Sequence, residues 1–113
     1  MAKPLSDIIE QLRQEETRWD AILELKLIQS EKYVEPLIKL LHDKDWVVRW
    51  CVAEKLGEMG HASALGPLAK LIADKDYHVR KNTAKALTRF GKNAIPFVVP
   101  YLKHLDFSCR QQA

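Results

Sequence analysis

The chain has 113 residues, 47 % of them hydrophobic and 29 % charged, with a formal net charge of +3. This length and balance suit one globular domain and exclude a wholly disordered chain. No stretch reaches the roughly 18 consecutive apolar residues of a membrane span, and 4 Gly and 5 Pro without strict apolar/polar alternation exclude an all-β fold.

The first segment in chain order, residues 5–28, carries apolar side chains at helical spacing. No Gly or Pro divides it, so the sequence leaves open whether it forms one bent helix or two. Residues 1–4 do not lead into a secretory hydrophobic stretch, and the two cysteines show no close metal-ligand spacing. We therefore expect a cytoplasmic protein with free thiols.

A helix hairpin is predicted next, over residues 36–60. Its first helix begins near Pro36, where a missing backbone N–H costs least, and carries an apolar stripe. Asp45 is the expected N-cap of a second helix, in which apolar residues recur every fourth position from Val48. Gly60 marks the end of that helix.

This hairpin is repeated along the chain. Residues 36–60 align with residues 67–91 without a gap at a shift of 31, which pairs the Asp-Lys-Asp turns, the Val-Arg dipeptides and the final glycines. Weaker matches lie 31 residues earlier, at Arg18-Trp19, and 30 residues later, at Asp106-Phe107. One hairpin cannot cover its own apolar faces, so neighbouring hairpins must stack. The sequence predicts an all-α, right-handed α-solenoid of antiparallel helix pairs in a single domain, 1–113, with units at 4–30, 31–61 and 62–92 and a partial unit at 93–113.

The repeated string P-L-x-K-L-x-x-D-K-D-x-x-V-R, followed by Ala, Leu and Gly, resembles the HEAT repeat in its short form, called phycobilisome-lyase HEAT-like. Residues 1–30 depart from it by lacking the Asp-x-Asp turn, and Pro100 is expected to kink the last helix. The resemblance implies that the second helices line a concave face. It also implies that Arg49 and Arg80 pair with the turn aspartate of a neighbouring unit.

The second helices carry side chains that differ between units, whereas the packing positions repeat. Spacings of four place Glu15, Trp19, Leu23 and Leu27 on one strip of the first unit. A variable surface on a regular framework predicts a non-catalytic scaffold that binds a protein or peptide partner. The predicted binding residues are Trp19, Trp46, Trp50, Glu54, Tyr77, Lys81, Lys85 and Arg89. Packing against the next unit is the structural alternative for the aromatic residues.

The charge distribution suggests another class of partner. Residues 61–113 hold 9 Lys/Arg and 3 Asp/Glu, whereas residues 1–60 hold 9 and 12. The basic strip over residues 81–89 therefore also suits a phosphate backbone. Aromatic residues are not interleaved with these lysines, which makes nucleic acid the weaker alternative.

An enzymatic alternative, bilin attachment or removal, rests on the resemblance alone. The four histidines are scattered and no nucleotide-binding or nucleophile motif is present, so we expect no catalytic residue, metal or cofactor. Cys51 is expected to be partly buried and unreactive. Apolar residues of the partial unit, such as Phe97 and Tyr101, lack full cover, which predicts self-association, a partner or a longer array at that end.

Overall fold

The computed structural model describes residues 3–101, and every regular element within this range is helical. The longer helices are α1 (Leu5–Leu12), α2 (Arg18–Lys26), α3 (Val34–Lys39), α4 (Trp46–Met59), α5 (Leu65–Lys70) and α6 (Tyr77–Thr88). Short 3₁₀ turns precede or extend them: η1 (Glu31–Tyr33), η2 (Leu40–His42), η3 (Ala62–Ala64), η4 (Leu71–Ala73) and η5 (Gly91–Ala94). Residues 95–101 are also helical.

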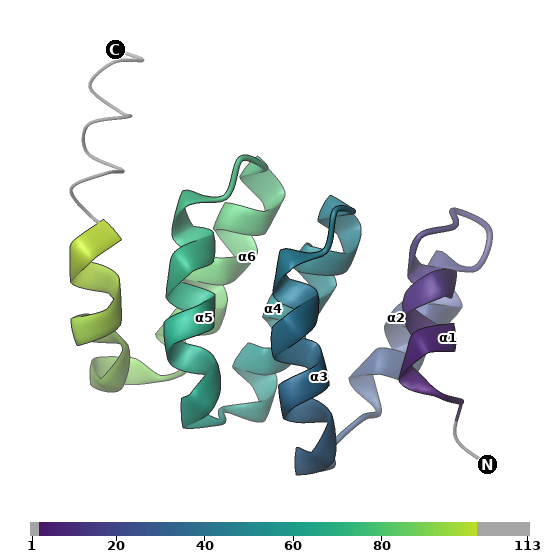
Figure 1. Ribbon diagram of the computed structural model, residues 1–113, viewed down its shortest axis with the longest axis horizontal. Coiled ribbons are helices and arrows are strands. Elements are labelled where there is room, and N and C mark those ends of the chain that lie inside the picture. The colour runs from purple at the N-terminus through teal and green to yellow at the C-terminus, as the bar shows by residue number, and fades with distance from the viewer. Residues whose placement is uncertain (1–2, 102–113) are drawn as a thin grey trace.

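The helices stack in pairs (Figure 1). Helices α1, α3 and α5 form one layer, and α2, α4 and α6 form the other. The predicted α-solenoid of stacked antiparallel helix pairs is confirmed. The division into units with the predicted boundaries, all within one domain, stays a prediction. No helix in the described range is both long enough and apolar enough to span a bilayer.

The first pair settles the question left open for residues 5–28, because two helices form there. The chain turns between Leu12 and Arg18 without a Gly or Pro. Two side chains hold the turn: Thr17 Oγ1 donates to the Gln11 carbonyl (2.8 Å), and Arg18 Nε donates to the Leu12 carbonyl (2.9 Å). Side-chain bonds to the last carbonyls of α1 thus replace the usual turn residues.

The Asp-Lys-Asp turns cap the second helices as predicted. Asp45 Oδ1 accepts from the Val47 N–H (2.9 Å), and Asp76 Oδ1 accepts from the N–H groups of His78 (2.8 Å) and Val79 (3.1 Å). These carboxylates satisfy free amides and complement the helix dipole. At the other end of α4, Gly60 adopts a left-handed conformation with φ 64°, which a residue without Cβ adopts at little cost.

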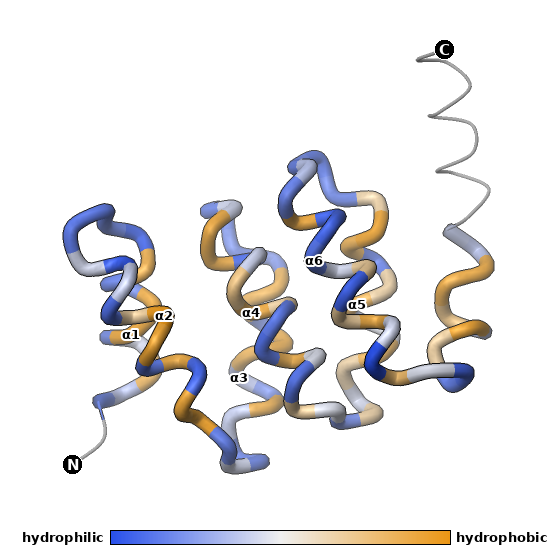
Figure 2. The backbone as a smooth tube through the Cα atoms, turned by 180° about the vertical axis from the view of Figure 1, so that it is seen from behind, coloured by the Kyte–Doolittle hydropathy of each residue, from blue (hydrophilic) through white to orange (hydrophobic). Residues whose placement is uncertain are grey.

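Apolar side chains from both layers form one core. Figure 2 shows hydrophobic stretches along the helices and hydrophilic residues at the turns that join the two helices of each pair. The largest side chains with no exposed surface include Leu12, Leu37, Leu41, Leu56 and Leu68. Burial of each contributes about 1.5–3 kcal/mol, so the stack is held mainly by these contacts between helices.

Candidate functional site

The outward side of α2, α4 and α6, which we call the second-helix face, contains all the predicted binding residues. On α2 the structure places Trp19, Leu23 and Leu27 one helical turn apart, with exposed fractions of 76 %, 61 % and 79 %. We call these three residues the apolar ridge. Leu23 and Leu27 are not among the predicted binding residues, although spacing places them on the same strip. Leu27 is as exposed as Trp19, and Leu23 is less exposed than either.

Helix α4 contributes an aromatic cluster that extends to α6. The Trp46 ring lies 6.1 Å from the Trp50 ring and stacks on the His78 ring at 5.2 Å, centroid to centroid. His78 also contacts Tyr77 edge-on, at 5.6 Å. Such pairs contribute about 0.5–1.5 kcal/mol beyond burial. The cluster therefore helps to join α4 to α6. The sequence alone does not reveal that His78 takes part in it.

Trp19 and Trp50 occupy equivalent repeat positions but have different surroundings. Trp19 is exposed, whereas Trp50 is half-buried and packs against the core. Asn82 Nδ2 donates to the Trp50 carbonyl at 3.3 Å, which ties α6 to this point of α4. Trp50 therefore contributes to packing and exposes only part of its side chain. Trp19 exposes most of its indole to solvent, so it is the more accessible of the two to a partner.

Helix α6 carries the basic part of the face. Lys81, Lys85 and Arg89 are all exposed, and none of them makes an ion pair within residues 3–101. Tyr77, at the start of the helix, is 60 % exposed. Glu54, on α4, is half-buried. The face thus changes from apolar on α2, through aromatic on α4, to basic on α6.

Ion pairs between units hold these helices in register. Arg49 Nε and Nη2 donate to the two Asp74 carboxylate oxygens at 3.0 and 3.2 Å, as the resemblance implied for Arg49. Arg18, at the equivalent position of the first pair, makes no such bond. Instead Arg13, which sequence reasoning missed, binds Asp43 through two bonds of 2.7 Å. Hydrogen bonding from Arg13 holds the pKa of Asp43 below its usual value.

Cys51 corrects one expectation. It is buried, not partly exposed, because α4 is covered on that side by neighbouring helices. Burial, followed by the nearby Glu54 carboxylate, raises the pKa of its thiol to about 12. A thiol with that pKa carries almost no thiolate near neutral pH, which disfavours a nucleophilic role for Cys51.

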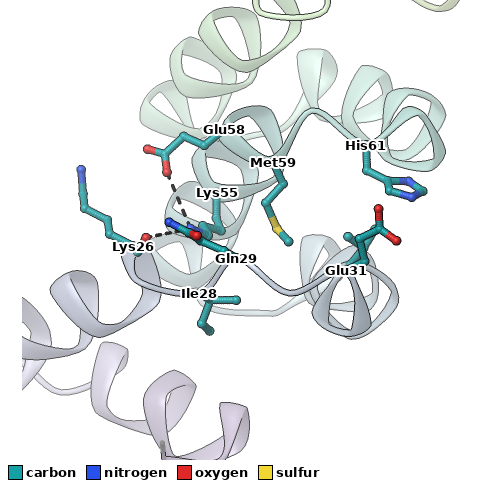
Figure 3. A pocket seen from close by; sticks show the side chains of 9 residues that line it. Lys26, Ile28, Gln29, Glu31, Lys55, Glu58, Met59 and His61 are labelled. Carbon is teal, nitrogen blue, oxygen red and sulfur yellow. Dashed lines mark hydrogen bonds and ion pairs between the residues drawn. The ribbon is translucent and has the colours of Figure 1, made fainter.

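A cleft of about 420 Å³ lies where α2, α3 and α4 meet (Figure 3). Lys55 lies buried at its base, where its Nζ donates to the Lys26 carbonyl at the end of α2 (2.9 Å) and lies 3.9 Å from Glu58. Burial lowers the pKa of Lys55, and Glu58 opposes that shift. Glu31 and His61 line the outer part of the cleft (Figure 3). Lys55 joins α4 to α2. The repeat pattern does not predict this contact, because the residue at the equivalent position of the next unit is Ala86.

Metal ligation has no support in the described range, because no three His, Cys, Asp or Glu side chains of residues 3–101 cluster closely enough to hold an ion.

A family model described as HEAT repeats matches residues 2–74 and 52–113 of the chain. The two matches together span nearly the whole sequence. A search of curated proteins finds no match. The narrower phycobilisome-lyase type of repeat, and with it any bilin chemistry, stays a prediction, as does the cytoplasmic location.

Proposed function

The chain belongs to the HEAT-repeat family, and from this premise we propose that it is a non-catalytic scaffold that binds a protein or peptide partner on the second-helix face. The observation that carries the proposal is the apolar ridge. Trp19, Leu23 and Leu27 remain largely in water although they stand side by side on one helix. Burial of each large apolar side chain contributes about 1.5–3 kcal/mol, so a partner that covers the ridge gains that stabilisation.

Trp19 is the expected anchor of the contact. Binding energy at protein interfaces is concentrated in a few residues, and Trp is among the most enriched of them. The Trp19 indole is the most exposed aromatic side chain on this face, and it loses little rotamer freedom on burial because it has only two side-chain torsions. Leu23 and Leu27 extend the contact along α2.

The remaining predicted residues make the chemical character of the face change from one helix to the next, and this change sets the orientation of a bound partner. Trp46, Trp50 and Glu54 lie on the central helix, and Lys81, Lys85 and Arg89 lie on α6. A partner that is apolar at one end and acidic at the other matches this gradient. The charge complementarity sets orientation and association rate more than affinity.

Phosphate-backbone binding is the second candidate, because the three basic side chains of α6 are exposed and unpaired among the described residues. Three phosphate contacts predict that log K falls with log salt at a slope of about −2 to −3. A protein partner anchored on the apolar ridge predicts a shallower slope. Nucleic-acid binding measured at several salt concentrations separates the two.

The test uses the intact chain as bait beside two variants. The ridge variant carries Trp19→Ser, Leu23→Ser and Leu27→Ser, all at exposed positions, so the fold is expected to survive. The control variant carries Glu35→Ser, an exposed position on α3 in the other layer. Proteins captured by the intact chain are purified, and their dissociation constants for all three baits are measured by calorimetry.

We expect the ridge variant to weaken binding at least about thirty-fold, since loss of an interface anchor costs about 2 kcal/mol or more. The control variant is expected to bind like the intact chain. Equal affinity of the ridge variant and the intact chain for every purified partner, with circular dichroism unchanged, contradicts the proposal.

A further inference from the structure

Three arginines at the same repeat position make the same local bond. Arg18, Arg49 and Arg80 each donate to the carbonyl six residues earlier, at 2.9, 2.7 and 2.8 Å. They differ in what else they bind. Arg49 also forms the buried ion pair with Asp74, whereas Arg80 makes no ion pair within residues 3–101. The Arg80 guanidinium carbon lies 5.9 Å from the Tyr77 ring centre, and the side chain is half-buried.

On α4, the stripe that begins at Arg49 is fully covered by α6. Ala53 and Leu56 have no exposed surface. Gly57 approaches so closely that a Cβ added there would lie 2.6 Å from the Ala86 Cβ. Helix α4 therefore presents to the next unit an arginine followed by a stripe of small and apolar residues. The next unit contacts α4 through the turn aspartate Asp74 and the apolar face of α6.

On α6, the same stripe is partly open within the described range. The counterparts of Arg49, Ala53, Leu56 and Gly57 are Arg80, Ala84, Leu87 and Thr88, and of these Ala84 and Thr88 are exposed. A groove of about 330 Å³ runs beside them. It is lined almost entirely by apolar side chains, among them Ile72, Ala84, Leu87, Ile95, Val98 and Val99.

We propose that this end of the stack is a second docking site, for a helix of a partner protein that carries an aspartate in the turn before it. The aspartate pairs with Arg80 as Asp74 pairs with Arg49, and the apolar side of the helix lies in the groove. This continues an interface that the molecule already contains between α4 and α6. It is separate from the apolar ridge, which lies on α2 at the opposite end.

The sequence favours a foreign helix over two other occupants. In a second copy stacked end to end, the position of Asp43 and Asp74 is taken by Leu12, which has no carboxylate. In the residues that follow in this chain, the corresponding position, 30 residues after Asp74, is His104. Neither places a carboxylate at the position from which Asp74 pairs with Arg49.

The probe is a fluorescent peptide that copies residues 74–90, because α6 is the one described helix that makes this contact. A hydrocarbon staple between positions 81 and 85 holds it helical and removes two lysines from the side that faces away from α4. Binding to the full 113-residue chain is followed by fluorescence anisotropy in about 300 mM salt, which suppresses non-specific attraction between charges.

We expect saturable binding that falls about 5- to 30-fold when the chain carries Arg80→Gln, and by a similar factor when the peptide carries Asn at the Asp74 position. The two changes together are expected to cost little more than either one, since they remove the same pair. Lys39→Gln, which removes an exposed cation from α3 in the other layer, is the matched control, and we expect it to leave the affinity unchanged.

Several results overturn the proposal. The first is that the peptide shows no saturable binding to the full chain. If deletion of residues 102–113 then restores binding, the chain's own end fills the groove, and the proposal fails in that case too. Equal binding by wild type and Arg80→Gln also overturns it. So does a dimer in light scattering that Arg80→Gln dissociates, because the occupant is then a second copy. Loss of peptide binding in the ridge variant would move the site to α2. Apart from that last result, none of these outcomes bears on partner capture by the ridge.

Discussion

The junction between α4 and α6 and the junction between α2 and α4 perform the same task with different residues. At the first, a buried Arg49–Asp74 pair and close backbone contact at Gly57 fix the spacing. At the second, Arg13 takes over from Arg18, and buried Lys55 reaches across to the end of α2. Both junctions contain a cation–anion tie, whereas close backbone contact is found at the α4/α6 junction. The residue that supplies the tie is free to change.

The largest effect is expected from breaking the buried pair at the α4/α6 junction. Arg49→Ala leaves the Asp74 carboxylate, whose side chain is 8 % exposed, without its counter-ion. Loss of one partner of a buried pair costs about 3–5 kcal/mol. Urea unfolding followed by circular dichroism measures this loss. A loss below about 1 kcal/mol would show that water already reaches the pair.

The next largest effect is expected from disturbing the close contact between α4 and α6 at Gly57. Gly57→Ala places a Cβ 2.8 Å from the Ala86 Cα, so α4 and α6 must separate, and overpacking of this kind costs about 1–3 kcal/mol. Gly66→Ala is the matched control, because its nearest new neighbour is Phe97 at 3.8 Å. Helix propensity then predicts a gain of up to about 1 kcal/mol in the control. Equal thermal shifts in the two variants would refute the close contact.

The partly exposed tie at the α2/α4 junction is expected to contribute less. Arg13→Ala should cost about 1 kcal/mol at pH 7, since this pair lies nearer the solvent than Arg49–Asp74. The lowered pKa of Asp43 means that this contribution is present above pH 3.8, the ordinary value for the group, and is lost as pH falls through the folded-state value. Unfolding curves of wild type and variant should therefore converge in acid. A constant difference from pH 7 to pH 2 would contradict the assigned role.

These junctions also separate what the sequence predicts from what it does not. The turn aspartates Asp45 and Asp76 cap their helices as predicted because the local turn is the same in both copies. Arg49 pairs as the resemblance implied, whereas Arg80 makes no ion pair within residues 3–101. Arg13 and Lys55 occur once, and their contacts depend on how far apart two helices lie, which no spacing in the chain specifies. The apolar ridge was partly predictable, because the counterparts of Trp19 and Trp50 in the later units, Lys81 and Gln111, are polar. The half-burial of Trp50 was not, because it depends on how the side chain packs against the core.

The smallest effect expected is a change in pH dependence from Lys55. Because burial lowers its pKa in the folded state, the unfolded chain binds more protons in the window that ends near its ordinary value of 10.5. Stability attributable to Lys55 therefore rises as pH increases through that window. Lys55→Met removes this rise, so the wild type should gain relative to the variant between neutral pH and about pH 10.5. A difference that stays flat or reverses would show that Lys55 is well solvated in the folded protein.

The central claim, that a protein partner covers the apolar ridge, is tested most directly by site-specific photo-crosslinking. A photoreactive amino acid replaces Leu23 on α2 in one sample, Glu35 on α3 in a second and Lys85 on α6 in a third. All three positions are exposed. The account predicts that position 23 labels a protein partner, that position 85 labels the same partner more weakly, and that position 35 labels none. Labelling of the partner at position 35 but not at 23, or of nucleic acid alone at position 85, would contradict it.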